Sequence, residues 1–534
     1  MPDVVVVGAG HNGLVAATLL ARAGLSVEVF ERADVVGGAC RTEHPFGKVP
    51  DLAASTGAYL LGLMPPELLR LLDVDLPLVR RDPHYFLPTL DGRHLLLGGD
   101  AAANRARLTE FSSAADARAA EAMAAELAAL RDDLAPAWLA DPLPVEETAE
   151  RYLRPALRET YVGMVRGSAM DYLGRFDFRS DLLVAMYAVT DGMPGLTGSP
   201  WTPGSGHNLL VHNMCRLPGS GGTWMIVRGG MGTVTRTIAA AAVRAGAVLR
   251  RSTTVDRILL ADGAAAGVST VDSRGTGAPT AARAVLVATD PFRLRGLLGA
   301  ALPAGLASAL DSWEQRSAGQ TMKVNLALAG LPRFAALPAD RGQHGSTVHL
   351  LPLGTDRRSP DPLGALRRAF DDAAAGRLPD APALEWYLHS TVDGSLRDAA
   401  GNHSSALFVQ GVPHEVAGSS WTVERPAYVE RLLDLVEAYA PGTRDLLVDV
   451  SALAPPDIRA HFGITSANIF HVDNAFAGAD RMPYVTGVPG VYAGSAGCHP
   501  AGSVIGAAGH NAANRILADL GVPAPHLAVR GDTI

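Results

Sequence analysis

The stretch Val4-Val5-Val6-Val7-Gly8-Ala9-Gly10-His11-Asn12-Gly13 decides the fold of this chain. The four valines form the short apolar run of a parallel strand that is buried on both faces, and the run stops at Gly8. Residues 14–22 predict a helix ended by Gly24, and residues 26–30 predict a second strand. Strand, glycine turn, helix and strand in this order are typical of a Rossmann-type α/β domain that binds a dinucleotide.

The three glycines of this stretch have separate tasks. Gly8 allows a tight turn, Gly10 lets the backbone approach a diphosphate, and Gly13 lets the helix pack closely on the strand. We expect the diphosphate to bind the free N–H groups at the positive end of the helix, where His11 and Asn12 lie. Glycine turns of this spacing are common, so the prediction depends on the whole series of elements in register.

An acidic residue, Glu31, closes the second strand. Its carboxylate is placed to accept hydrogen bonds from the ribose hydroxyls of an adenosine, and it would repel a phosphate on that ribose. The paired glycines that follow let the chain pass close under a bulky ligand, which simple NAD-binding proteins do not need. In this segment we expect the cofactor to contact Arg32, Gly37, Gly38, Ala39 and Thr42.

The composition is that of an ordinary globular protein. The 534 residues suffice for more than one core, and 48% of them are hydrophobic while 19% are charged. A formal net charge of −8 without a run of Lys or Arg argues against nucleic acid as a partner. The three cysteines are far apart and predict neither a disulfide framework nor a metal site.

The sequence predicts a cytoplasmic protein with at most peripheral membrane contact. The N-terminus leads directly into the first strand, without the regions of a signal peptide. No apolar segment reaches the roughly 18 uninterrupted residues of a membrane span. The leucine-rich segment 59–72 has two interpretations, a patch that dips into a membrane or the start of a buried helix, of which the second is commoner.

The middle of the chain carries no cofactor pattern. Asp91-Gly92 predicts a hairpin, Ser113 predicts the start of a helix that runs to about Leu134, and residues 145–164 predict further helix. In the glycine-rich loops that follow, His207 and His212 either line a substrate cavity or are structural. Further along, residues 323–328 predict a half-buried strand, and residues 427–439 predict an amphipathic helix.

The C-terminal region repeats the order of strand, glycine-rich turn and helix of small residues. Residues 490–500 provide the strand and the turn, and residues 501–513 provide the helix. Gly and Ala on successive turns allow something broad to lie close to this helix. The N-terminus of the helix could stabilise negative charge on a bound cofactor.

Together these motifs resemble the FAD family of amine oxidases, phytoene desaturases and carotene ketolases, in particular relatives named for a pyridine nucleotide-disulphide oxidoreductase domain. The resemblance implies FAD as the cofactor. It also implies an α/β fold in which a discontinuous Rossmann-type FAD-binding domain, residues 1–75, 226–296 and 485–534, is interleaved with an α+β substrate-binding domain, residues 76–225 and 297–484. The further FAD contacts that it implies are Val255, Gly494, Ser503, Val504 and Ile505. Many relatives carry an acidic residue after Gly494, where this chain has Ser495.

Two residues are candidates for catalysis. Lys323 is one of only two lysines, the other being Lys48, and it opens an apolar strand. In related amine oxidases a lysine on the equivalent strand holds a water beside the flavin, which implies that Lys323 assists the reaction of reduced flavin with oxygen. The alternative is a lysine at a strand end that extends its ammonium group to solvent. His499 lies in the C-terminal turn, where it would accept a proton, orient the substrate or cap the next helix.

The resemblance implies a flavoenzyme that removes a hydride from a hydrophobic substrate, isoprenoid or lipid-like, and passes it to flavin N5. Oxygen or a quinone would reoxidise the flavin. Two alternatives are also compatible with the sequence. One is amine oxidation, which needs an aromatic cage near the ring, and the other is a flavin-bound scaffold without turnover.

Overall fold

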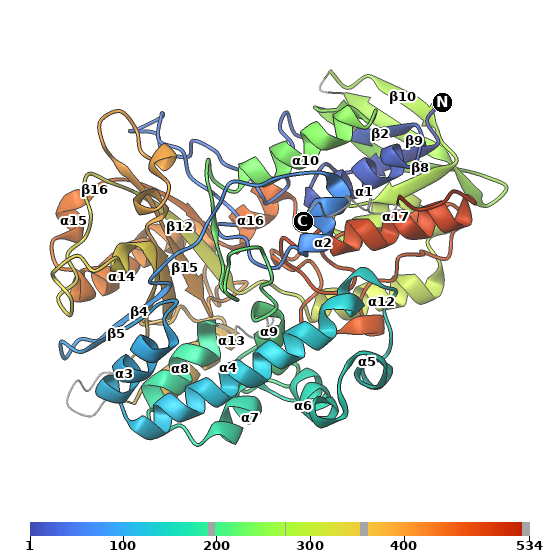
Figure 1. Ribbon diagram of the computed structural model, residues 1–534. Coiled ribbons are helices and arrows are strands. Elements are labelled where there is room, and N and C mark those ends of the chain that lie inside the picture. Colours follow the sequence, from blue (N-terminus) through green and yellow to red (C-terminus); the bar gives the residue numbers. More distant parts are fainter. Residues whose placement is uncertain (191–197, 273, 353–360, 526–534) are drawn as a thin grey trace, which may run out of the picture.

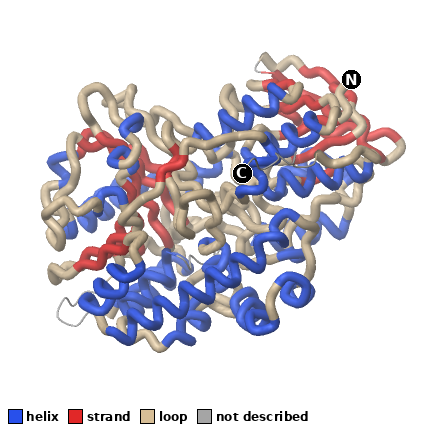
Figure 2. The backbone as a smooth tube through the Cα atoms, in the orientation of Figure 1, coloured by secondary structure: helices blue, strands red, loops and turns tan. Residues whose placement is uncertain are grey.

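The computed structural model describes residues 1–190, 198–272, 274–352 and 361–525. The end of the predicted FAD-binding domain, residues 526–534, lies outside the described part. Figures 1 and 2 show the strands gathered in two separate regions, and the helices of residues 101–212 lie along one edge of the molecule. The two termini of the described chain belong to the same lobe.

The first sheet is parallel and contains the valine strand at its centre. Its spatial order is β17, β11, β1, β2, β7. These strands are β1 (Val4–Val7), β2 (Val27–Phe30), β7 (Val248–Arg250), β11 (Ala284–Val287) and β17 (Val491–Ala493). All four residues of β1 are buried, because the strand is paired on both edges and covered on its faces. The predicted Rossmann-type core is therefore confirmed, and it joins both ends of the chain.

Three helices pack beside this sheet, namely α1 (His11–Arg22), α10 (Gly232–Arg244) and α17 (Ala507–Asp519). Helix α1 begins at His11, three residues before the predicted start, and contacts both other helices. A Cβ atom on Gly509 would lie 2.0 Å from the backbone oxygen of Asn12. The small residues of α17 thus allow α1 to approach it, and the broad neighbour expected from the sequence is a helix.

In the described part of the chain the second sheet has seven strands in the order β16, β12, β15, β14, β13, β4, β5, and only its β13–β4 pair is parallel. Its strands are β4 (Tyr85–Pro88), β5 (His94–Leu97), β12 (Thr321–Leu328), β13 (Thr347–Leu350), β14 (Ala383–Tyr387), β15 (His403–Gln410) and β16 (Leu447–Leu453). The hairpin predicted at Asp91-Gly92 is confirmed by the β4–β5 pair.

Strand β12 differs from the half-buried strand that its sequence predicts. All eight of its residues are buried. Met322, Val324 and Leu326 pack in one cluster with residues of α14 (Trp421–Tyr439), and the other face of the strand turns toward the interior between the two sheets. A strand covered on both faces does not need the polar side that a solvent-exposed face would show.

Helices form a third layer. They are α3 (Ala101–Phe111), α4 (Ala114–Leu134), α5 (Val145–Tyr152), α6 (Pro155–Arg166), α7 (Ala169–Leu173), α8 (Asp181–Thr190), α9 (Ser205–His212) and α13 (Pro362–Ala374). Ser113 caps α4 by accepting from the Asp116 amide at 3.1 Å, as predicted. The helix predicted over residues 145–164 is interrupted before Pro155, which begins α6. None of the described helices is long and apolar enough to span a membrane.

The remaining helices and strands lie outside these two sheets and the helical layer. They are α2 (Pro66–Leu72), α11 (Leu294–Leu298), α12 (Ala304–Gln315), α15 (Thr443–Leu446), α16 (Pro455–Phe462), a three-stranded sheet of β8 (Thr253–Ala261), β9 (Ala264–Asp272) and β10 (Gly277–Ala281), and the pair β3 (Leu78–Val79) and β6 (Ile226–Val227). Leu68 and Leu72 of α2 are buried, so the leucine-rich segment is part of the core. Leu310 and Trp313 of α12 share the core of the parallel sheet, although the predicted boundary assigns them to the other domain.

We predict that Gly509→Ala lowers the melting temperature of the holoprotein. The added methyl group would meet the Asn12 oxygen, and overpacking of this kind costs about 1–3 kcal/mol. The matched control is Gly163→Ala inside α6, where a Cβ atom would have no neighbour within 4 Å. This control should be neutral or stabilise the protein by up to about 1 kcal/mol, because alanine favours helix. Equal melting temperatures for both variants would contradict the packing described here.

Candidate functional site

A cavity of about 540 Å³ lies between the two sheets. On one side it is lined by the turn between β1 and α1, by residues of the segment 30–41, and by Val255. On the other side it is lined by residues of β12, β14 and β15 in the seven-stranded sheet. One continuous space therefore connects the dinucleotide-type turn with the second sheet.

The turn between β1 and α1 fits a diphosphate. Gly8 has φ +102°, which glycine adopts without strain, and a Cβ atom on Gly10 would meet nothing within 4 Å. Gly10 is the N-cap of α1, and no described side chain caps the helix there. The first N–H groups of α1 thus open toward the cavity without a side-chain acceptor, and an anionic oxygen satisfies both their hydrogen bonds and the helix dipole. A Cβ atom on Gly13 would lie 2.1 Å from the Gly8 oxygen, so Gly13 serves the packing of helix on strand.

The segment after β2 fits an adenosine. Glu31 lines the cavity, and its carboxylate accepts from the amides of Ala9 at 2.9 Å and Ala33 at 3.0 Å. Gly37 and Gly38 have φ +128° and +60°, and Gly37 forms an isolated parallel bridge with Gly10. The paired glycines therefore bring the chain back under the diphosphate turn, and a Cβ atom on Gly37 would lie 2.6 Å from the Cys40 carbonyl oxygen.

Most of the predicted cofactor residues share the cavity lining. The structure places there Gly8, Gly10, His11, Asn12, Glu31, Arg32, Gly37, Gly38, Ala39, Val255, Ser503 and Val504. Beside Gly13, three others have structural roles. The Thr42 hydroxyl donates to the Gly229 carbonyl at 3.1 Å, Gly494 packs against Ala512, and Ile505 belongs to the core of the helical layer. Ser495 is buried, and its hydroxyl accepts from the Gly497 amide at 3.1 Å.

Lys323 lies on β12 with its ammonium group inside the cavity. Its side chain is 5% exposed, so it does not extend to solvent as a surface lysine would. Nζ donates to the carbonyls of Ser55 at 3.0 Å and Gly57 at 2.9 Å and lies 4.2 Å from the centre of the Tyr59 ring. Burial holds the pKa of Lys323 well below its usual value, because desolvation disfavours the charged form.

His499 is not part of the cavity lining, contrary to the predicted position beside the cofactor. It is 8% exposed, and its Nε2 forms a 2.9 Å hydrogen bond with the carbonyl of Ala137. Burial lowers the pKa of His499 to about 4. The turn that carries it faces the helical layer, so His499 joins that layer to the parallel sheet. Of the two histidines left open by the sequence, His212 lines the cavity and His207 bonds the Asn474 carbonyl.

A row of side chains crosses the seven-stranded sheet in register with Lys323. Lys323 is paired with Phe408 on β15, Phe408 with Glu385 on β14, and Glu385 with His349 on β13. Since adjacent strands are about 4.8 Å apart, Lys323 and Glu385 are separated by roughly 10 Å at the backbone. Lys323, Phe408 and Glu385 line the cavity. The sheet thus presents an apolar ring between the amino group of Lys323 and the carboxyl group of Glu385.

Two tyrosines cover the apolar part of this row. The rings of Tyr59 and Tyr387 lie 4.4 Å apart between centroids, and the Tyr387 hydroxyl donates to Glu385 at 2.6 Å. Burial raises the pKa of both tyrosines well above the usual value, so they remain protonated donors. Sequence reasoning missed Glu385 and Tyr387 as site residues. The available signal was a carboxylate within an otherwise apolar strand, which is uncommon unless it is paired or functional.

Comparison with known proteins places the chain among flavoproteins. The family model for flavin containing amine oxidoreductases matches residues 13–359. "Pyridine nucleotide-disulfide oxidoreductase domain-containing protein 2" of Mus musculus is 34% identical, over 97% of this chain and 94% of that protein. "Hydroxyneurosporene desaturase" of Cereibacter sphaeroides is 28% identical, over 97% of this chain and 98% of that protein. A solved oxidoreductase from Methanosarcina mazei has a TM-score of 0.60 at 15% identity, over 96% of this chain and 99% of that one.

These findings agree with the geometry of the cavity. The solved structure shares the fold of this chain. In this chain the strands of the two sheets alternate along the sequence, as the family resemblance implies. The turn at Gly10 and the carboxylate of Glu31 fit the diphosphate and the adenosine of FAD, and the cavity continues from there toward Lys323. The chain belongs to the flavin containing amine oxidoreductase family and is an FAD-dependent oxidoreductase.

Proposed function

We propose that this protein is a dehydrogenase or desaturase that removes a hydride from a carbon atom of a hydrophobic, isoprenoid-like substrate. The observation that carries the proposal is the continuity of the cavity from the diphosphate turn to an apolar chamber on the seven-stranded sheet. When bound, FAD supplies the hydride acceptor, N5 of its ring. The name of the relative from Cereibacter sphaeroides, a desaturase, supports a substrate of isoprenoid type.

The chamber is suited to an apolar molecule. Leu60, Tyr387, Phe408 and Phe470 form one buried cluster that lines the cavity, with Tyr59, Trp224 and Ile469 packed against it. Such walls exclude water and hold a hydrocarbon chain by burial of its surface, at about 25 cal/mol per Å². Exclusion of water protects a reactive centre from side reactions.

Lys323 is the proposed catalytic residue for reoxidation. Its Nζ donates to the backbone carbonyls of Ser55 and Gly57, and these two bonds fix the amino group beside the segment 55–57, which borders the cavity. A fixed cation in a water-poor site stabilises negative charge that develops on an acceptor beside it. We propose that Lys323 in its ammonium form assists electron transfer to oxygen, or to a quinone in the same position.

Amine oxidation is the second candidate, and it is favoured by Tyr59 and Tyr387, two aromatic residues of the cavity lining whose ring faces attract an amine. Anaerobic mixing of the holoprotein with candidate substrates separates the two reactions. We expect isoprenoid compounds to bleach the flavin absorbance and to yield a product with one additional C=C bond. Bleaching by amines alone, with imine formation, would replace the dehydrogenase proposal by the amine oxidase.

For the adenosine end of the cavity, we predict that Glu31→Gln weakens FAD binding roughly ten- to a hundredfold. Loss of a charged acceptor costs about 1.5–3 kcal/mol in hydrogen bonding. The dissociation constant is measured from the fluorescence of released flavin. Glu28→Gln is the matched control, because Glu28 lies on β2, three residues before Glu31, but pairs with Arg250 at the surface. If Glu31→Gln and Glu28→Gln bind FAD equally well, Glu31 has no role in the site.

For the other end, we predict that Lys323→Met slows reoxidation of the reduced flavin by oxygen about ten- to a hundredfold, since one fixed charge is removed. Stopped-flow absorbance measures this rate. Lys48→Met, which changes the exposed second lysine, should leave the rate unchanged. Flavin content and melting temperature show whether Lys323→Met merely loosens the segment 55–57. Unchanged oxygen kinetics in Lys323→Met would remove this residue from the mechanism.

The same proposal fixes the sign of a pH dependence. The ammonium form predominates below the pKa of Lys323, so reoxidation should be fast at low pH and slow as the pH rises through that pKa. Because burial holds the pKa well below its usual value, the decline should occur at lower pH than for an exposed lysine. In Lys323→Met this transition should be absent, and a transition that persists there belongs to another group.

A further inference from the structure

A buried arginine, Arg81, lines the chamber and has no role in the proposed hydride transfer or in reoxidation of the flavin. It is 3% exposed and lies in the connection between β3 and β4. Its Nε donates to the carbonyl of Trp224 at 3.2 Å, and its Nη1 donates to the hydroxyl of Thr347 at 2.7 Å. Both acceptors are neutral. Within the described residues this guanidinium forms no ion pair and no further hydrogen bond.

A second buried arginine shows how a purely structural guanidinium is satisfied. Arg481 is 1% exposed and does not line the cavity. Its N–H groups donate to the carbonyls of Val472, Asp473, Phe476, Ala496 and Cys498 and to the side-chain oxygen of Asn474. A guanidinium has five N–H donors, so Arg481 is saturated, whereas the two bonds of Arg81 leave Nη2 without a described partner. A guanidinium with free donors at a cavity wall is stabilised when a ligand accepts from those donors.

The charges around Arg81 do not complete it either. Glu385 affects Arg81 only through space, and its carboxylate accepts from Tyr387. Burial lowers the pKa of Arg81, and the surrounding acidic groups oppose this effect, so the guanidinium stays charged. The cavity therefore holds a fixed positive charge whose remaining donors are available to an anionic oxygen.

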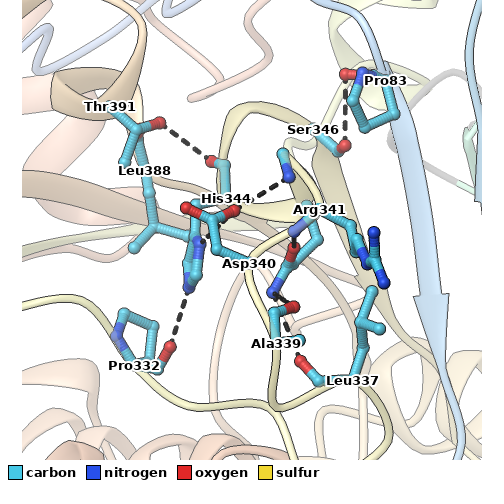
Figure 3. Close-up of polar contacts among 12 residues, drawn as sticks. Pro83, Pro332, Leu337, Ala339, Asp340, Arg341, His344, Ser346, Leu388 and Thr391 are labelled. Atoms are coloured by element: carbon cyan, nitrogen blue, oxygen red, sulfur yellow. Dashed lines mark hydrogen bonds and ion pairs between the residues drawn. The ribbon is translucent and has the colours of Figure 1, made fainter.

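The position of the guanidinium is fixed by its surroundings. Figure 3 shows the loop that precedes β13, in which His344 bonds the Pro332 carbonyl at 2.8 Å and Thr391 donates to the His344 carbonyl at 3.1 Å. Ser346 donates to the Pro83 carbonyl at 3.2 Å and so ties the start of β13 to the segment after Arg81. Thr347, which accepts from Arg81, follows directly. A charge held in this way loses little entropy when it binds a ligand.

The distance to the proposed reaction centre sets the size of the ligand. Thr347 on β13 lies three strands from Lys323 on β12, which corresponds to roughly 14 Å at about 4.8 Å per strand. Burial lowers the pKa of His389 to about 3, and the positive charges of Lys323 and Arg81 lower it as well. Lys323 and Arg81 therefore both lie within electrostatic range of the His389 imidazole. The apolar cluster of Leu60, Tyr387 and Phe408 belongs to the same chamber.

We propose that the substrate is an amphiphile, an apolar chain with a carboxylate at one end, and that Arg81 is the specificity-determining residue that binds this carboxylate. This inference rests on the proposed function, because it names the substrate class of the same chamber. It distinguishes the substrate from a pure hydrocarbon, which would leave the guanidinium unsatisfied, and from an amine, whose charge would be repelled by Arg81.

The test uses the FAD-loaded protein and three probes that share one isoprenoid tail, namely farnesoic acid, farnesol and farnesylamine. Binding is measured anaerobically from the change in the flavin absorption spectrum. We expect farnesoic acid to bind at least tenfold more tightly than farnesol, since a charge-assisted hydrogen bond contributes about 1.5–3 kcal/mol. Arg81→Gln should abolish this preference and leave the affinity for farnesol unchanged, while Arg80→Gln, at the exposed neighbouring position, should preserve it.

Equal binding of the acid and the alcohol to the unchanged protein, tighter binding of the amine, or a preference that survives Arg81→Gln would each overturn the inference. The first two comparisons need no variant, so they hold even if Arg81→Gln does not fold. The proposed function fails separately. If farnesoic acid binds preferentially but no isoprenoid bleaches the flavin, the carboxylate-binding role of Arg81 is supported and the dehydrogenase proposal is contradicted. If an isoprenoid bleaches the flavin but the acid is not preferred, the dehydrogenase proposal is supported and the role of Arg81 is contradicted.

Discussion

The open N-terminus of α1 is the constraint on which the rest of this structure depends. Its first residues line a cavity and no described side chain caps the helix there, so an anionic ligand group can accept from its first N–H groups. This constraint explains the glycines at 8 and 10, while Gly13 lets the helix that carries these N–H groups pack on its strand. Gly509 brings the C-terminal helix against Asn12, so the last part of the chain supports the turn formed by the first part.

The second sheet supplies what the parallel sheet lacks. A parallel sheet offers backbone donors at the ends of its strands but few side chains that differ in chemistry across its surface. The antiparallel strands β12, β15 and β14 place Lys323, Phe408 and Glu385 side by side in one row. Strand register fixes this row. The spacing between Lys323 at one end of the chamber and Arg81 at the other is therefore set by the backbone and changes little with side-chain motion.

Sequence reasoning predicted the elements whose causes are local. The valine run, the glycine turn and the Asp91-Gly92 hairpin each depend on residues within a few positions, and the structure confirms them. It failed where the cause is distant. β12 was expected to be half buried because α14, which covers it, lies about a hundred residues away. His499 follows a glycine motif, yet its partner is the carbonyl of Ala137. Nothing in the local sequence separates the buried Arg81 from the exposed Arg80.

The most direct measurement of the central claim is a structure of the protein determined with FAD bound. The account predicts the diphosphate at Gly10 and the start of α1, the adenosine beside Glu31, and the flavin ring at the segment 55–57 close to Lys323. A flavin ring outside the chamber on the seven-stranded sheet, or a diphosphate away from α1, would contradict it.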